Sequence, residues 1–170
     1  MYLFMIMLYS MLSTQQPSVY DYSFKSIDGK EVSLADFKGK QLLLINTASK
    51  CGFTKQYKEL QELHEQYGDK LVVIGFPSDN FGGQEFDAND KIQEFCEQNF
   101  GVTFMLSEKV NVKGDKINPL FKYLTTAENA DFTGDIKWNF EKFLINKDGK
   151  LVHRYRSKVT PLDESITSQI

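Results

Sequence analysis

The sequence predicts an α/β domain with a mixed central sheet that is flanked by helices and preceded by a β-hairpin. Two short apolar runs, at residues 42–45 and 71–76, are each followed by a helical pattern, as strands buried on both faces often are. Asp-Gly pairs at 28–29 and 148–149 lie between strand-like segments and indicate tight hairpin turns. The 170 residues, 41% of them hydrophobic and 25% charged, suit one globular domain.

The first elements are an N-terminal hairpin and a buried strand. Residues 20–25 and 30–34 flank Asp28-Gly29 and are predicted to be the two strands of the hairpin. Residues 41–48 contain four consecutive aliphatic side chains, which is typical of a strand buried on both faces.

The next elements are a helix and a second buried strand. Residues 55–67 place apolar side chains at spacings of three, three and four, which is typical of an amphipathic helix: Tyr57, Leu60, Leu63 and Tyr67. We expect Thr54 to cap the N-terminus of this helix and Gly68 to end it. Residues 71–76 then form a buried strand that ends at Pro77.

The second half of the chain predicts a loop, two helices and another hairpin. In chain order these are the Gly- and Asn-bearing loop 78–85, the helix 89–100, the short helix 118–124, and the strands 140–146 and 150–155. Helix 89–100 carries an apolar stripe, comprising Ile92, Phe95, Cys96 and Phe100, and we expect it to end at Gly101.

This order of elements predicts a thioredoxin-like fold with an added N-terminal hairpin. In sheets of this type the chemistry lies at the carboxyl ends of the parallel strands, beside the N-termini of helices. The residue between the first buried strand and the first helix is therefore the leading candidate, and that residue is Cys51.

Cys51 lies between Lys50 and Gly52, ahead of the first helix. Unpaired backbone N–H groups and the positive end of the helix dipole favour a thiolate in that place, and Lys50 adds a nearby positive charge. Gly52 allows a tight turn and the close approach of a ligand. The alternative is a buried and inert cysteine, which a long apolar strand would favour more than this segment does. We therefore interpret Cys51 as a reactive thiol.

The other cysteine, Cys96, lies on the apolar stripe of its helix. Taken alone, it is best interpreted as a core residue, because free cysteine is among the most often buried residue types. An oxidised Cys51 would nevertheless need a second thiol, and the chain has just these two cysteines. Thr54 occupies the second cysteine position of a Cys-x-x-Cys motif, so any disulfide must join different elements and requires a helix to move.

Gln84, Trp138 and Asn139 lie in segments that the predicted sheet places around Cys51. Gln84 follows the second buried strand, and Trp138-Asn139 immediately precedes the strand 140–146. Taken singly, they are typical of a solvated loop residue, a core aromatic and a turn residue. Taken together, they could supply amide and indole N–H donors to a sulfur anion and a bound peroxide.

Charge and motifs exclude several classes of function. The 20 basic and 23 acidic side chains give a net charge of −3, which does not provide the basic face that a nucleic-acid partner requires. Two histidines and two cysteines, far apart in the chain, predict no metal site. Glycine-rich phosphate-binding motifs are missing from the sequence, so we expect no nucleotide cofactor and no other cofactor.

Residues 1–18 form an apolar extension ahead of the predicted domain, residues 19–170. Every residue of Met1–Leu12 except Ser10 is apolar, but this run is shorter than the roughly 18 residues that span a bilayer, and we expect no stable membrane insertion. The first basic residue is Lys25, whereas a secretory signal begins with a basic region. We interpret the extension as a translated segment upstream of the true start, with a cleaved leader as the alternative.

Three segments of the chain resemble the motifs of the glutathione peroxidase family in its cysteine form. They are 46–57 (NTASKCGFTKQY), 75–85 (GFPSDNFGGQE) and 138–143 (WNFEKF). The shorter segments 100–104 and 118–120 also match, and the likeness runs from about residue 19 to residue 161 without large gaps.

The resemblance implies a thioredoxin-like fold and a thiol peroxidase that reduces hydrogen peroxide and organic or lipid hydroperoxides. Cys51 corresponds to the peroxidatic cysteine, and Gln84, Trp138 and Asn139 correspond to the other members of the catalytic tetrad. Cys96 corresponds to the resolving cysteine of the thioredoxin-dependent branch. The expected reductant is therefore a thioredoxin-type protein rather than glutathione, and the residues beside Cys96 offer no basic cradle for an anionic tripeptide.

The chain also departs from the family pattern. Ser78 occupies a position where many relatives have a cysteine, which leaves Cys96 as the partner for Cys51. Phe86 occurs where a proline is common, and the proline that is usual between the residues corresponding to Phe104 and Met105 is lacking. The segment between Thr126 and Lys137 lacks the insertion that helps some relatives to form tetramers, so we expect a monomer.

Two expectations complete the interpretation. A thiol pair that cycles with thioredoxin suits a reducing compartment, so we expect a cytoplasmic protein, or an exported one if the apolar extension is a leader. The alternative function, from a different class, is a peroxide-sensing redox adaptor that relays its disulfide to a partner protein.

Overall fold

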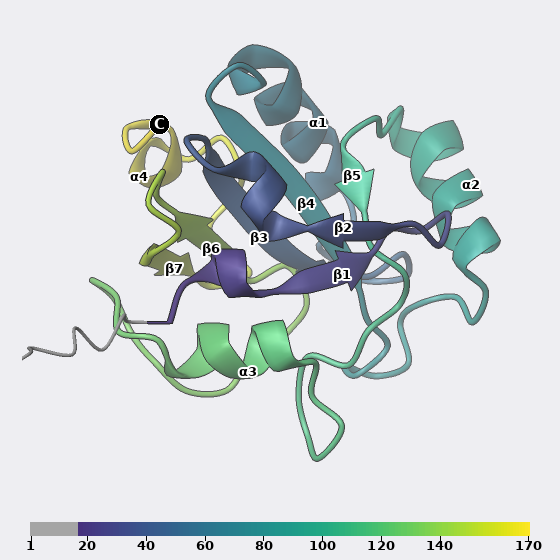
Figure 1. The fold of residues 1–170 in the computed structure, drawn as a ribbon. Coiled ribbons are helices and arrows are strands. Elements are labelled where there is room, and N and C mark those ends of the chain that lie inside the picture. The colour runs from purple at the N-terminus through teal and green to yellow at the C-terminus, as the bar shows by residue number, and fades with distance from the viewer. Residues whose placement is uncertain (1–16) are drawn as a thin grey trace, which may run out of the picture.

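The computed structural model describes residues 17–170 and has the predicted α/β architecture (Figure 1). Its centre is a five-stranded sheet in the order β5-β4-β3-β6-β7. The strands are β3 (Gln41–Thr47), β4 (Leu71–Pro77), β5 (Met105–Leu106), β6 (Lys142–Ile145) and β7 (Leu151–Tyr155). β3 pairs parallel with β4 and antiparallel with β6, and β6 pairs antiparallel with β7. The predicted parallel pair extended by an antiparallel hairpin is therefore confirmed.

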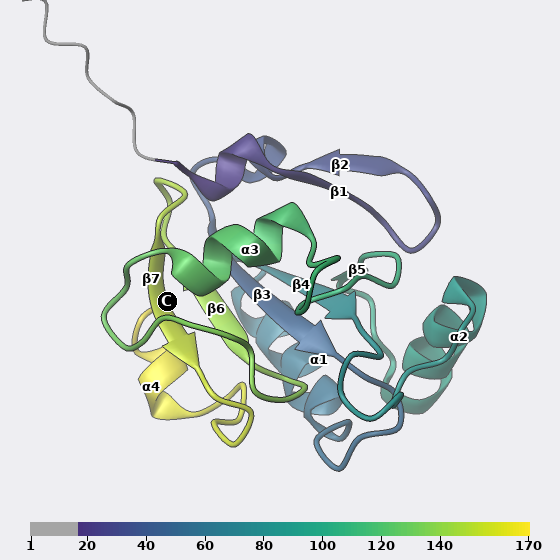
Figure 2. The ribbon, with the colours of Figure 1, turned by 90° about the horizontal axis from the view of Figure 1, so that it is seen from below.

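Helices cover both faces of this sheet (Figure 2). One face packs against α1 (Gln56–Tyr67), α2 (Asn89–Phe100) and α4 (Glu164–Thr167), and the other against α3 (Pro119–Thr126). The side chains of β3 alternate accordingly: Leu43 and Ile45 belong to the α1 side of the core, and Leu42 and Leu44 to the α3 side. This arrangement explains why β3 is apolar without interruption.

The N-terminal hairpin is also confirmed, although its strands are shorter than predicted. β1 (Ser23–Lys25) and β2 (Glu31–Ser33) form a separate antiparallel sheet between two 3-10 helices, η1 (Val19–Asp21) and η2 (Leu34–Phe37). Phe24 packs its ring edge-on against Phe76 at 5.2 Å, which fixes the hairpin to the α3 side of the core.

Besides η1 and η2, two short elements that pack on the central sheet, β5 and α4, were not predicted. β5 has two residues and α4 has four, and neither is long enough to produce a recognisable hydrophobic period. Both depend on their neighbours: β5 pairs with β4, and Ile166 of α4 is buried in the core.

The apolar stretch Met1–Leu12 lies outside the described residues. Ser18, at the end of the predicted extension, accepts a hydrogen bond from the backbone of Tyr20 and so caps η1. In the part of the chain that the structure describes, no helix is long and apolar enough to cross a membrane.

Candidate active site

The sheet topology brings the three predicted motifs to one edge of the sheet. β3 and β4 end level with each other, because Thr47 pairs with Pro77, so the loops carrying Cys51 and Gln84 leave from the same edge. β6 runs in the opposite direction, and the segment before it returns to that edge, where the Phe140 N–H donates to the Asn46 carbonyl at 2.6 Å. The arrangement expected for Cys51, Gln84 and Trp138-Asn139 is thus observed in the backbone.

Cys51 is partly exposed and lies in a tight turn that Thr54 holds closed. The Thr54 hydroxyl accepts a hydrogen bond from the Cys51 N–H at 2.9 Å and donates to the Ala48 carbonyl at 2.7 Å. The Phe53 N–H points at the Cys51 sulfur, at 3.4 Å. A backbone donor therefore faces the sulfur, as a stabilised thiolate requires.

Thr54 does not cap the first helix, so that prediction was wrong. α1 begins at Gln56 with Lys55 in the capping position and no side-chain cap. Thr54 is instead used by the Cys51 turn, where its hydroxyl bonds two backbone groups. The sulfur is consequently held by this turn ahead of the helix rather than by the first turn of α1.

Lys50 links the Cys51 loop to the Gln84 loop. Its N–H donates to the Gln84 carbonyl at 2.9 Å, and its ammonium group lies over the Phe86 ring at 4.1 Å from the centroid. The charge of Lys50 is therefore directed to an aromatic face. The backbone bond is the contact that places the Gln84 loop beside Cys51.

Gln84 and Asn139 are joined directly. The Asn139 side-chain NH₂ donates to the Gln84 side-chain oxygen at 3.1 Å. Asn139 is fully buried, and its side-chain oxygen has no hydrogen-bond partner among the described residues. A buried acceptor without a partner is costly, so this oxygen is a polar group that the surrounding side chains leave unsatisfied. The pairing also leaves the Gln84 NH₂ group as a donor.

Trp138 is exposed at the site rather than buried in the core. Its exposed fraction is 40%, and among the described residues it is the one large hydrophobic side chain classed as exposed. The indole packs against Phe81 at 5.7 Å between ring centroids. The interpretation of Trp138 as a core aromatic is therefore wrong, and part of the ring is accessible at the surface.

Cys96 is fully buried on α2. Burial raises the pKa of the Cys96 thiol to about 12, although the neighbouring Tyr57 hydroxyl opposes the rise. Cys51 and Cys96 are both free thiols, so the structure does not bring Cys96 to Cys51 in a disulfide. The burial is compatible with a core residue and with a resolving thiol that is exposed when α2 opens.

Three residues of the site were missed in the sequence, although they lie inside or beside its motifs. Asn46 bonds both sides of the Trp138 segment, Glu141 is a fully buried carboxylate, and Glu85 is a nearly buried carboxyl next to Gln84. Burial raises the pKa of Glu85, and the Phe86 N–H, which donates to Glu85 Oε1 at 2.8 Å, partly offsets this effect. The sequence did contain one signal for these residues, because Asn46 is a polar residue at the end of an otherwise apolar strand.

Metal ligands do not gather at this edge. Within residues 17–170, no group of three or more His, Cys, Asp or Glu side chains is arranged to hold a metal ion.

Comparison with known proteins places this site in a family. The family model described as "Glutathione peroxidase" matches residues 19–125. The chain is 49% identical over 146 residues to the glutathione peroxidase-like peroxiredoxin GPX5 of Chlamydomonas reinhardtii, covering 85% of this chain and 90% of that protein. It is also 49% identical over 151 residues to the hydroperoxy fatty acid reductase gpx1 of a Synechocystis species, covering 85% and 89%.

A solved structure agrees with both the fold and the family. The crystal structure of T. cruzi GPX1 superposes with a TM-score of 0.70 at 32% identity, covering 88% of this chain and 93% of that one. The predicted thioredoxin-like fold with its added hairpin is confirmed. The sequence match, the fold and the placement of Cys51, Gln84 and Asn139 agree, and the chain belongs to the glutathione peroxidase family.

Proposed function

We propose that the protein reduces hydroperoxides through Cys51. The Cys51 thiolate attacks one oxygen of the peroxide, the S–O bond forms as the O–O bond breaks, and the departing oxygen takes up a proton to leave as water or an alcohol. Cys51 is left as a sulfenic acid. The observation that carries this proposal is the hydrogen-bonded arrangement of the Cys51 turn, Gln84 and Asn139 at one edge of the sheet.

The neighbouring side chains have separate roles. The Gln84 NH₂ group donates to the reacting oxygen or sulfur, and the buried Asn139 amide fixes Gln84 for this role by donating to its side-chain oxygen. The exposed Trp138 ring and Phe81 offer an apolar surface beside them. The relative named a hydroperoxy fatty acid reductase supports organic as well as inorganic peroxides as substrates.

Cys96 resolves the sulfenic acid. Its sulfur attacks the Cys51 sulfur, the S–S bond forms as the S–O bond breaks, and the hydroxide leaves as water with the thiol proton. Because Cys96 is fully buried on α2, this step requires α2 to open first. Once the helix opens, the attack is intramolecular and competes well with a diffusing thiol.

A thioredoxin-type protein reduces the resulting disulfide. Glu94 and Glu97 lie on either side of Cys96 in α2, and Lys91 on the same helix is already paired with Glu94 at 3.0 Å, so this stretch supplies no spare positive charge for the carboxylates of glutathione. We also propose a monomer in the cytoplasm, on the grounds of the short segment between Thr126 and Lys137 and of a thiol pair that must be kept reduced.

Rapid-mixing kinetics with three proteins tests these roles. The wild type should consume hydrogen peroxide and an organic hydroperoxide, and Cys51→Ser should not. Cys96→Ser should reduce one equivalent of peroxide and then fail to cycle with thioredoxin. Retained fast reduction in Cys51→Ser contradicts the assignment of the nucleophile.

The reductant and the function class are tested separately. Better wild-type turnover with glutathione than with thioredoxin contradicts the proposed reductant. Negligible turnover with either reductant, together with fast disulfide transfer to another protein, favours the peroxide-sensing adaptor.

A further inference from the structure

Three charged side chains lie directly behind the segment that carries Trp138 and Asn139. Glu141 and Arg154 are fully buried, and Arg156 is 40% exposed at the side chain. We call these residues the Glu141 triad and call residues 137–141 the Trp138 turn. None of the three touches the peroxide in the mechanism above. A direct part in the reaction therefore does not explain why the Glu141 carboxylate is buried between two arginines.

The Glu141 carboxylate is fully occupied. One oxygen accepts hydrogen bonds from the Lys137 N–H and from the Arg156 guanidinium, each at 2.7 Å. The other oxygen accepts two bonds from the Arg154 guanidinium, at 2.9 and 3.3 Å. One side chain therefore joins the residue before Trp138 to two arginines of the β7 region.

The same turn is held from its other side by Asn46, at the end of β3. The Asn46 NH₂ group donates to the Trp138 carbonyl at 3.1 Å, and its side-chain oxygen accepts the Glu141 N–H at 3.0 Å. The backbone on both sides of Trp138 and Asn139 is thus bonded to residues outside the turn.

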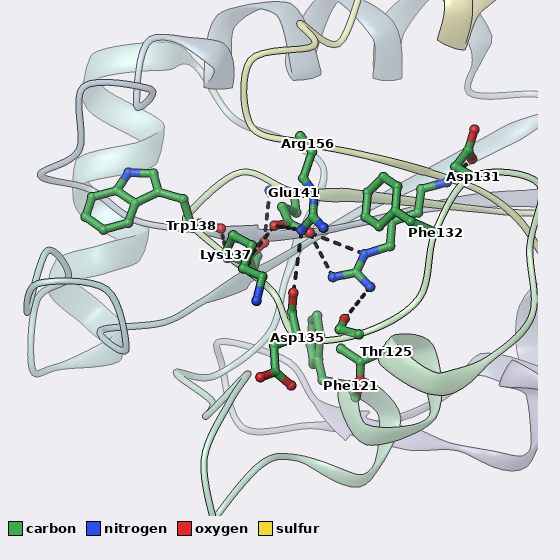
Figure 3. Close-up of polar contacts among 12 residues, drawn as sticks. Phe121, Thr125, Asp131, Phe132, Asp135, Lys137, Trp138, Glu141 and Arg156 are labelled. Carbon is green, nitrogen blue, oxygen red and sulfur yellow. Dashed lines mark hydrogen bonds and ion pairs between the residues drawn. The ribbon is translucent and has the colours of Figure 1, made fainter.

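The turn contains a strained residue that these bonds must hold in place. Phe140, directly after Asn139, has a φ of 64°, the single positive φ outside glycine in residues 17–170. A bulky side chain rarely adopts this backbone conformation, and it persists where the surroundings impose it. The reversal at Phe140 directs the Asn139 amide inward to Gln84, while the Trp138 ring points away from Glu141 and Arg156 (Figure 3).

We infer that Glu141 is a positioning residue that sets the orientation of Trp138 and Asn139 for the peroxide reaction. Arg154 and Arg156 hold the Glu141 carboxylate in place for this role. This inference rests on the proposed role of Cys51. It is specific to the first step, because the triad fixes the segment that carries Trp138 and Asn139, and none of its hydrogen bonds or ion pairs in residues 17–170 reaches Cys96 or α2.

Glu141→Gln is the sharpest test. The amide keeps one oxygen for the Lys137 N–H, but its NH₂ group faces guanidinium donors and cannot accept from them. The variant is made in a Cys96→Ser background, so that Cys51 is the sole thiol. Two second-order rate constants are measured per titratable thiol: one with hydrogen peroxide, which needs Gln84, Trp138 and Asn139, and one with iodoacetamide, which needs the thiolate.

We expect the peroxide rate constant to fall at least tenfold and the iodoacetamide rate constant to change less than threefold. Trp138 is the one tryptophan in the chain, so its emission maximum and its quenching by acrylamide report the turn directly, and both should change. Ile166→Ala, at the one buried residue of α4, is the control for a general loss of stability and should alter neither rate constant per titratable thiol.

Unchanged peroxide reactivity in Glu141→Gln overturns the inference, as does an equal fall in both rate constants. If Glu141→Gln does not fold, the same comparison on the more exposed Arg156→Gln decides: a selective loss with altered emission supports the inference, and an unchanged rate overturns it. If the Cys96→Ser protein with Glu141 intact does not react with peroxide, that result contradicts the proposed function instead.

Discussion

Replacing Gly101 by alanine tests whether the opening of α2 controls the second step of the reaction. Gly101 ends α2 with a φ of 62°, and the following N–H, that of Val102, donates to the carbonyl of Cys96 at 3.3 Å. An added Cβ would have no atom within 4 Å, so the substitution introduces backbone strain without a collision. The strain falls on the turn of helix that carries Cys96.

The size of the effect follows from this geometry. Alanine in the left-handed conformation costs about 1 kcal/mol, which corresponds to about a fivefold larger fraction of molecules with the end of α2 open. In the closed helix, the rise of the Cys96 pKa from 9.0 to about 12 leaves about a thousandfold less thiolate than an exposed cysteine has. Disulfide formation should therefore proceed through the open fraction, and Gly101→Ala should form the Cys51–Cys96 disulfide about fivefold faster.

The assay follows the disulfide after one equivalent of hydrogen peroxide, by acid quenching, alkylation and mass spectrometry. Gly114→Ala is the matched control, because Gly114 also has a positive φ and open space for a Cβ but lies in a loop apart from α2. It should leave the rate of disulfide formation unchanged. An unchanged rate in Gly101→Ala, or alkylation of Cys96 in the reduced protein as fast as that of Cys51, would refute the reasoning.

Three further predictions concern the site and the core. Asn139→Ala removes the hydrogen bond to Gln84 and should lower the rate constant for peroxide about a hundredfold in stopped-flow measurements; a loss below threefold contradicts the role of Asn139. Burial lowers the pKa of Lys142 to about 7, whereas the pKa of this side chain in the unfolded chain is 10.5. Between these two pH values the unfolded chain binds more protons than the folded protein, so the free energy of unfolding rises with pH. Thermal unfolding should show this rise, and Lys142→Met should lack it. Burial raises the pKa of Glu85 above its unfolded value of 4.5, so its ionisation makes the wild type less stable as the pH rises above 4.5. Glu85→Gln lacks this loss, and its midpoint temperature of unfolding should exceed that of the wild type by an amount that grows from pH 4.5 to pH 7. A difference that stays constant with pH contradicts the burial argument.

The elements that span the core could be predicted because their side chains repeat. β3 and β4 are apolar on both faces, and α1 and α2 have buried residues at helical spacing, so the sequence alone indicates their type and order. β5 and α4 are too short for a period, and their conformation depends on residues distant in sequence.

The placement of the candidate site residues could be predicted from the sequence, but the contacts that support them could not. Cys51, Gln84, Trp138 and Asn139 lie in motifs whose order places them at one sheet edge. The use of Thr54 in the Cys51 turn and the bonds of Asn46 to the Trp138 turn depend on distances of a few ångströms between segments far apart in the chain. Local spacing carries no information about such contacts.

The complete burial of Cys96 has a consequence for damage by excess peroxide. On the proposed mechanism, the sulfenic acid on Cys51 persists while α2 stays closed, and a second peroxide molecule can oxidise it to a sulfinic acid that thiols do not reduce. Two rates then compete: helix opening, which does not depend on peroxide concentration, and further oxidation, which rises in proportion to it. The proposed mechanism therefore predicts that the conformational stability of one twelve-residue helix, α2, sets the peroxide concentration at which the enzyme inactivates itself.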